Sequence, residues 1–273
     1  MRVAEIASEG RQVRFDHGAL RTVVSGAGGA LPSGFRAFSR ILEPLGFRVS
    51  RKYPLPRLHM MGRSFTHQDF PDSIAQFFVS EISLSGFSST FQQAAERVIA
   101  GSGDPLSADA VQSLTRLSFM HSLPYDEAVA LMRALLPCFG RQHPVPALAD
   151  YEQLLGESAE MAWIATEGNT FNHVTERVDD IEWVADAQKK LGRPMKSAIE
   201  VSASGRIRQT AYRATLVERE FLRADGSRIV RRVPGSFYEF IQRAPACVDG
   251  ESQLDLSFDS SNAQGIFRMT DVA

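Results

Sequence analysis

A diverged repeat is the feature of this sequence that most constrains its fold. The pattern Phe-(Asp or Asn)-His-x-x-x-Arg occurs around His17 and again, past the middle of the chain, around His173. Each copy stands in a short run rich in Phe, Val, Leu and Thr, which is typical of a β-strand. Side chains two and four residues apart share one face of a strand. We therefore expect His17 and Arg21 to point the same way, and His173 and Arg177 likewise.

The repeat continues downstream of each histidine. Glu81 stands 64 residues after His17 in an apolar, strand-like run, and Glu239 stands 66 residues after His173 in another. Self-similarity at a nearly constant spacing indicates a repeated unit of structure. We predict two copies of one module, each opening on a histidine strand and closing on a glutamate strand.

The order of patterns within each copy predicts a βαβββ module. In residues 12–88, a strand is followed by a loop rich in Gly, Pro and Ser, then by apolar residues at helical spacing and about three more strands. Residues 167–245 repeat this order, with acidic residues at the start of the helix. A strand is expected from Gln209 to Leu222, and a hairpin turn at Arg223–Gly226.

The rest of the chain is expected to add helices between the modules and strands after them. Residues 89–166 carry capped helical patterns, which predict a helical insertion whose last helix covers 150–165. The tail, residues 246–273, alternates enough to predict one or two closing strands at 253–258 and 265–269. Together, residues 1–273 are expected to form a single catalytic domain.

Composition excludes several classes of function. The 273 residues can bury a sizeable core, and a formal charge of −2 offers no electrostatic basis for binding nucleic acid or an anionic membrane. The chain has no apolar run of bilayer-spanning length, and its first residues lack the apolar core of a signal peptide. Cys138 and Cys247 are isolated, which argues against a disulfide framework or structural zinc. We expect a cytoplasmic protein with reduced thiols.

Two imidazoles and one carboxylate converging from three strands can form a metal site. This facial set of ligands suits non-haem Fe(II) and leaves positions open for a chelating substrate and for O₂. His17 and His173 supply the two nitrogens. The carboxylate could come from Glu81 or Glu239, and the symmetry of the sequence does not choose between them.

The arginines add information about the substrate. Four strand residues span about 13 Å, so a ligand held by the metal at one end and by Arg21 at the other would be a short dicarboxylate. Arg21 would bind its distal carboxylate with two charge-assisted hydrogen bonds. Arg177 and Arg243 also lie four residues past a proposed ligand, and could steady carboxylates beside the metal.

Three motifs in combination resemble a known family. They are Asp-His-Gly-Ala-Leu-Arg-Thr at 16–22, Asn-His-Val-Thr at 172–175 and Phe-Tyr-Glu-Phe-Ile-Gln-Arg at 237–243. With the segment 63–81, they resemble the 2-oxoadipate dioxygenase/decarboxylase family, also called hydroxyglutarate synthases and formerly a domain of unknown function. The resemblance covers most of residues 12–245.

The resemblance implies a fold, a metal and a reaction. The fold would be α+β and vicinal-oxygen-chelate-like, with paired βαβββ modules forming a curved mixed sheet or barrel around a metal. The implied ligands of Fe²⁺ are His17, His173 and Glu239, in preference to Glu81, and Arg21 would bind the substrate carboxylate. The implied reaction uses O₂ to decarboxylate a 2-oxo dicarboxylic acid, first of all 2-oxoadipate, giving 2-hydroxyglutarate and CO₂.

Two other functions remain open on the same residues. A glyoxalase-like isomerase or metal-dependent hydrolase would use the fold with zinc or nickel and without O₂. A binding module without catalysis would have no need of a complete set of ligands. The expected partners are a small 2-oxo acid and O₂, with no nucleic acid and no membrane, and the sequence does not predict an oligomeric state.

Overall fold

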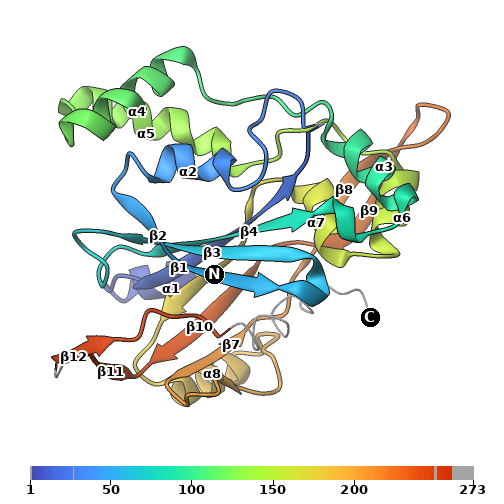
Figure 1. Ribbon diagram of the computed structural model, residues 1–273. Helices are drawn as coiled ribbons and strands as arrows, with labels where there is room; N and C mark the ends of the chain where they lie inside the picture. Colours follow the sequence, from blue (N-terminus) through green and yellow to red (C-terminus); the bar gives the residue numbers. More distant parts are fainter. Residues whose placement is uncertain (1, 27, 249–250, 260–273) are drawn as a thin grey trace.

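Eight strands form one curled sheet that organises the molecule (Figure 1). The computed structural model describes residues 2–26, 28–248 and 251–259. The order of strands across the sheet is β2-β3-β4-β1-β5-β10-β7-β6. These strands are β1 (Phe15–Val24), β2 (Phe47–Leu55), β3 (Met60–His67), β4 (Gln76–Ser83), β5 (Phe171–Arg177), β6 (Glu200–Val201), β7 (Ile207–Ala211) and β10 (Phe237–Arg243).

Each half of the sheet has the same topology. Strand β1 pairs in parallel with β4, β5 pairs in parallel with β10, and the antiparallel pair β1–β5 joins the halves. Helix α2 (Arg36–Leu42) follows β1, and α8 (Ile181–Lys190) follows β5. The predicted α+β fold of paired βαβββ units is therefore confirmed.

The second half contains an additional pair of strands that the sequence patterns did not distinguish from the strands of the main sheet. Strands β8 (Leu216–Leu222) and β9 (Arg228–Pro234) form a two-stranded ribbon outside the main sheet, joined at the predicted turn. The single strand predicted from Gln209 to Leu222 is wrong, because it divides into β7, which pairs with β10, and β8, which pairs with β9. Apolar alternation favours a strand but does not say which neighbour the strand pairs with.

The residues between β4 and β5 form five α-helices. They are α3 (Ser89–Ile99), α4 (Ala108–Met120), α5 (Tyr125–Leu135), α6 (Leu148–Leu155) and α7 (Ala159–Glu167). The helix predicted over 150–165 is two helices, because Ser158 Oγ accepts a hydrogen bond from Met161 N and starts α7 as its N-cap. Short 3₁₀ turns lie at Pro56–Leu58, Leu84–Gly86 and Leu136–Phe139.

The two ends of the described chain pack beside the sheet in different ways. At the start, α1 (Arg2–Ser8) was not predicted, and it is tied to β5 by two hydrogen bonds of 2.9 and 2.8 Å from Arg2 to Glu176. Near the end, β11 (Pro245–Val248) and β12 (Glu251–Leu254) pair with each other. The predicted strand at 253–258 is therefore shifted toward the N-terminus, and the one at 265–269 lies outside the described residues.

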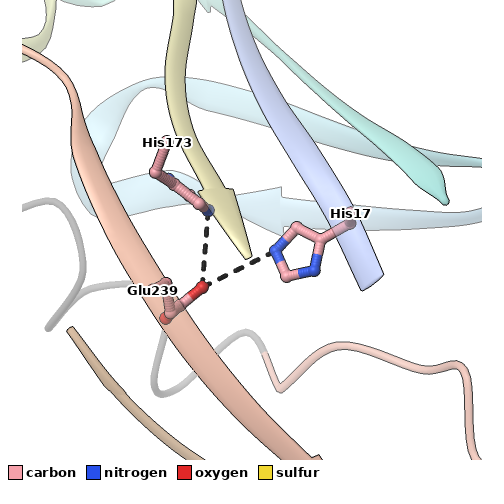
Figure 2. Close-up of side chains that lie close together, drawn as sticks. All are labelled: His17, His173 and Glu239. Carbon is pink, nitrogen blue, oxygen red and sulfur yellow. Dashed lines mark ion pairs between the residues drawn. The ribbon is translucent and has the colours of Figure 1, made fainter. Parts of the chain in front are cut away.

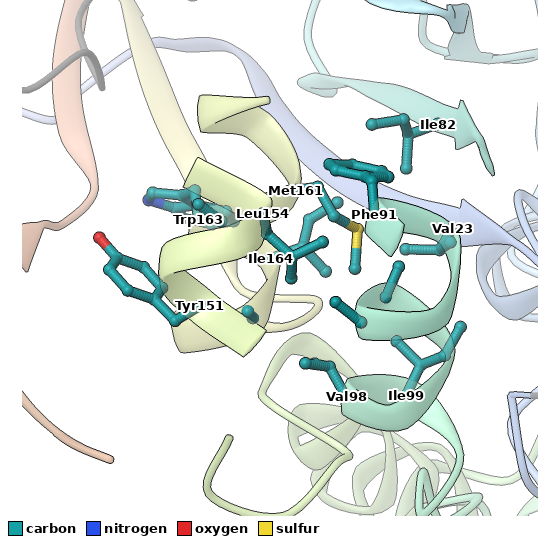
Figure 3. Packing of buried hydrophobic residues seen from close by; sticks show 14 of the residues in the cluster. Val23, Ile82, Phe91, Val98, Ile99, Tyr151, Leu154, Met161, Trp163 and Ile164 are labelled. Atoms are coloured by element: carbon teal, nitrogen blue, oxygen red, sulfur yellow. The ribbon is translucent and has the colours of Figure 1, made fainter. Parts of the chain in front are cut away.

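Helices α2 and α8 cover the outer face of the sheet. Phe65 and Val79 pack in one apolar cluster with Phe38 of α2, and Phe240 packs in another with Val184 of α8. Because side chains alternate along a strand, the neighbours of Val79 and Phe240 point to the opposite, inner face. A third cluster joins α3, α6 and α7 to the ends of β1 and β4 (Figure 3).

Over the described residues, the helices are too short or too polar for any of them to cross a bilayer.

The outer-face core gives a direct test of this packing. Phe38 is 1% exposed, whereas Phe119 on α4 is 77% exposed. Phe38→Ala should lower the free energy of unfolding by about 3–5 kcal/mol, because it removes a buried ring and leaves a cavity. Urea denaturation measures this, with Phe119→Ala as the control expected to change it by less than about 0.5 kcal/mol. Equal effects of the two substitutions would contradict the assigned core.

Candidate metal centre and substrate pocket

Three strands at the centre of the sheet bring two histidines and one glutamate together (Figure 2). His17 on β1, His173 on β5 and Glu239 on β10 are all buried, and their possible ligand atoms lie within 4.8 Å of one another. Glu239 Oε2 is 3.7 Å from His17 Nε2 and 3.6 Å from His173 Nε2. The structure therefore brings together the three residues that the resemblance implied as ligands.

Two β-bulges explain why the residue before each histidine is Asp or Asn. In the β1–β5 pair, Phe15 and His17 oppose consecutive residues of β5, so Asp16 is an extra residue on β1. Asn172 is likewise an extra residue on β5, opposite the step from Ala19 to Leu20. A bulge re-aims the side chain of its extra residue. Each extra residue places an oxygen beside the Nδ1 of the next histidine, at 2.9 Å in the first strand and 3.2 Å in the second.

These contacts orient both imidazoles toward Glu239. An imidazole that donates from Nδ1 leaves the lone pair of its Nε2 available. Thr175 on β5 pairs with both His17 and Glu239 and adds a third contact. Its hydroxyl donates to Glu239 Oε2 at 2.7 Å and lies 3.1 Å from His17 Nε2. The three possible ligand atoms thus meet at one point on the inner face.

Asp16 is held in place by two arginines, the buried Arg243 and the half-buried Arg177. Arg177 Nε donates to one carboxylate oxygen at 2.8 Å, and Arg243 donates to both oxygens at 2.9 Å each. Burial alone would raise the pKa of Asp16, but the hydrogen bond with His17 and the charge of Arg243 hold it well below its usual range. The two arginines that we expected to steady a carboxylate both bind this one.

Glu81 lies on the other face of the sheet. Its neighbour Ser80 lines the inner pocket, whereas Glu81 accepts hydrogen bonds from Arg63 at 2.5 Å and from Phe35 N at 2.9 Å. The nearly equal spacing in the sequence was misleading, because the number of residues between the histidine and its partner on the parallel strand differs between the halves. His173 pairs with Phe237, two residues before Glu239, whereas His17 pairs with Gln76, two residues before Phe78. The counterpart of Glu239 in the first half is therefore Phe78.

The charges at the site fit a bound cation. Burial raises the pKa of Glu239, and burial together with the charges of His17 and Arg21 lowers the pKa of His173 well below its usual value. The Nε2 atom of His173 is buried and has no hydrogen-bond partner among the described residues. A divalent ion between the three atoms would supply that partner and balance the buried carboxylate. Two imidazoles and one carboxylate match the ligand preference of Fe(II).

A pocket of about 540 Å³, its open mouth included, lies over this site. Arg21 lines the pocket with both histidines, and its place beside His17 agrees with the strand face that the two were expected to share. Its guanidinium carbon lies 5.3 Å from the ring centre of Trp163 on α7. The helices between the two halves therefore reach the predicted substrate arginine.

Several residues that line the pocket could not be predicted as site residues from the sequence. They are Ser80, Asn172, Gln209, Phe258 and Asp259, together with Thr175 behind the ligands. Only Asn172 carried a signal, because it occupies the same place in the repeat as Asp16. The others lie near the site through strand pairing or through the path of the tail.

Comparisons with known proteins agree with this geometry. The family model described as 2-oxoadipate dioxygenase/decarboxylase matches residues 2–268. A crystal structure of a putative glyoxalase superfamily protein from Ralstonia eutropha JMP134 is 53% identical, with a TM-score of 0.89 over 94% of this chain and 78% of that one. None of the curated proteins compared with this chain matches it.

Two more distant structures share the fold. A putative hydrolase from Shewanella frigidimarina NCIMB 400 is 24% identical, with a TM-score of 0.67 over 95% of this chain and 92% of that one. The hydroxyglutarate synthase of Oryza sativa, solved in complex with 2-oxoadipate, is 20% identical, with a TM-score of 0.72 over 98% of this chain and 85% of that one. Because the family model spans nearly the whole chain, this protein belongs to the 2-oxoadipate dioxygenase/decarboxylase family of enzymes.

Proposed function

We propose that this protein is an Fe(II)-dependent oxygenase that decarboxylates a 2-oxo dicarboxylic acid, with 2-oxoadipate as the first candidate. The observation that carries the proposal is the buried set His17, His173 and Glu239, which opens into the same pocket as Arg21. Family membership supports the same reaction. With 2-oxoadipate the products would be 2-hydroxyglutarate and CO₂. One oxygen atom of O₂ enters the new carboxylate and the other forms the hydroxyl on the neighbouring carbon.

The protein residues around the metal have distinct roles in this proposal. Fe(II) held by the two histidines and Glu239 would provide open positions for a chelating 2-oxo acid and for O₂. Asp16 keeps the proton of His17 on Nδ1, so that Nε2 remains a ligand atom. Thr175 fixes the carboxylate of Glu239 by its hydrogen bond of 2.7 Å.

Arg21 would bind the far end of the substrate. Its side chain is buried in the pocket wall, where a carboxylate gains strongly from a guanidinium partner. The Trp163 ring beside it helps to fix the orientation of the guanidinium. A substrate with carboxylates at both ends satisfies the metal and Arg21 together.

The isolated Cys138 and Cys247 also support a cytoplasmic location for this enzyme.

A metal-dependent isomerase or hydrolase that does not use O₂ is the second candidate. The observation that favours it is the description of the 53% identical protein as a glyoxalase superfamily member. The same three ligands could hold zinc or nickel and polarise a carbonyl oxygen. Oxygen consumption distinguishes the two functions.

The first measurement is oxygen uptake. Protein loaded anaerobically with Fe(II) should consume O₂ when 2-oxoadipate is added, and mass spectrometry should find one 2-hydroxyglutarate for each O₂ consumed. Uptake with a different 2-oxo acid would keep the reaction and change the substrate. If no 2-oxo acid supports uptake, while the zinc or nickel form turns over a substrate without O₂, the second candidate replaces the first.

The ligand assignment is tested by removing one imidazole. His173→Ala should abolish stoichiometric binding of Fe(II) while leaving the circular dichroism spectrum unchanged, because two remaining ligands do not complete a site. Metal analysis after anaerobic loading and desalting measures this. The matched control is His121→Asn, at an exposed helix end, which should bind iron like the original protein. Full iron content in His173→Ala would show that the site is elsewhere.

The role of Arg21 is tested on substrates with and without a second carboxylate. Arg21→Ala should raise the KM for 2-oxoadipate by about tenfold or more, since a buried charge-assisted pair is lost. It should change the KM for 2-oxohexanoate, which lacks the distal carboxylate, much less. Steady-state oxygen uptake gives both constants. The proposed role fails if the two acids are affected equally.

A further inference from the structure

The end of the described chain crosses the inner face of the sheet and enters the pocket. We call residues Asp255–Asp259 the tail segment. Phe258 and Asp259 line the pocket together with His17 and His173, although they lie more than 80 residues beyond the second histidine. The tail segment therefore forms part of the wall that a substrate would meet.

Arg243 binds the tail segment and the support of the metal site at the same time. Its Nε and one terminal nitrogen donate to Asp16, and its other terminal nitrogen donates to the carbonyls of Asp255 and Ser257 at 2.7 Å each. The guanidinium is fully buried. Because Asp16 also binds His17, one buried side chain links the tail segment to a proposed metal ligand.

Both halves of the sheet anchor the tail segment. From the first half, the Tyr53 hydroxyl accepts from Phe258 N at 3.1 Å, and Gln76 donates to the Leu256 carbonyl at 3.3 Å. From the second half, Ala203 N donates to Asp259 at 2.9 Å. The tail segment is therefore held against the site by contacts from both halves.

The ring of Phe258 stands against the metal end of the pocket. Its centre lies 4.7 Å from that of His17, edge to face, and 4.9 Å from that of Phe78. On β1, Ala19 lies between His17 and Arg21 on the same face of the strand. Ala19 pairs with Phe78 on β4, so Phe78 also lies between the two ends of the pocket. Phe258 and Phe78 therefore form an aromatic wall beside the space between the metal ligands and Arg21.

We propose that Phe258 is a specificity-determining residue that restricts the pocket to unbranched 2-oxo acids. The inference rests on the proposed function, in which the 2-oxo acid head lies at the metal ligands and the distal carboxylate lies at Arg21. The carbons next to the oxo group then pass along the wall of Phe258 and Phe78. A slender methylene chain packs against two aromatic rings, whereas a substituent on carbon 3 overlaps with the Phe258 ring.

The test compares the binding of straight and branched acids to substituted proteins. Dissociation constants for 2-oxoadipate and 3-methyl-2-oxoadipate are measured by calorimetry under argon on the Fe(II)-loaded protein, so that no turnover is involved. The original protein should strongly prefer the straight acid. Phe258→Ala should reduce that preference by roughly tenfold or more, the discrimination that one methyl group typically gives in a tight pocket. Phe258→Leu should give an intermediate preference, and metal content should be unchanged in both.

A matched control and three outcomes make the test decisive. Phe119→Ala removes an exposed phenylalanine on α4, so it should leave the preference unchanged. If the original protein binds 2-oxoadipate but Phe258→Ala and Phe258→Leu keep the full preference for the straight acid, Phe258 has no role in specificity. If Phe258→Ala does not fold, the ratio of the two dissociation constants is measured on Phe258→Leu instead, and an unchanged ratio there excludes a role of Phe258 in specificity. If the original protein binds no 2-oxo acid, the proposed function fails, and this inference fails with it.

Discussion

The rest of the site depends on the hydrogen bonds and ion pairs made by the buried carboxylate of Asp16. It accepts from Arg177, Arg243 and His17, and these contacts join β1, β5 and β10 at one point. Burying a carboxylate is unfavourable unless charge and hydrogen bonds compensate, and removing it would leave the buried Arg243 and the half-buried Arg177 without their anionic partner. The orientation of His17 and the position of the tail segment both follow from this one ion-pair cluster.

The bulges make that interaction possible. In a regular strand Asp16 and His17 would point to opposite faces, and a carboxylate next to an inward histidine would lie on the outer side of the sheet. The extra residue in β1 lets Asp16 lie beside the ring of His17, and the extra residue in β5 does the same for Asn172 and His173. The repeated Asx-His pair thus has the same structural role in both halves, which is to place a side-chain oxygen beside the Nδ1 atom of the histidine.

The two halves have diverged where function requires asymmetry. The equivalent positions of the two halves carry Glu239 in the second and Phe78 in the first, so the carboxylate of the candidate metal site comes from the second half. The aromatic residue on the other side packs with Phe258 from the tail segment. The duplicated scaffold therefore surrounds the site with charged groups from both halves, Glu239 from the second and Arg21 from the first, beside the aromatic rings of Phe78 and Phe258.

The sequence by itself determined most strands of the main sheet and the duplication, and it singled out the two histidines, because strand composition and period-two alternation are local properties. The resemblance to a known family also pointed to Glu239. The spacing alone could not reject Glu81, since the face on which a strand residue lies relative to its neighbours depends on hydrogen-bond register across strands. Only the tertiary structure decided the bulges at Asp16 and Asn172 and the place of Phe258 beside His17. Those depend on pairing between segments far apart in the chain, which no local pattern encodes.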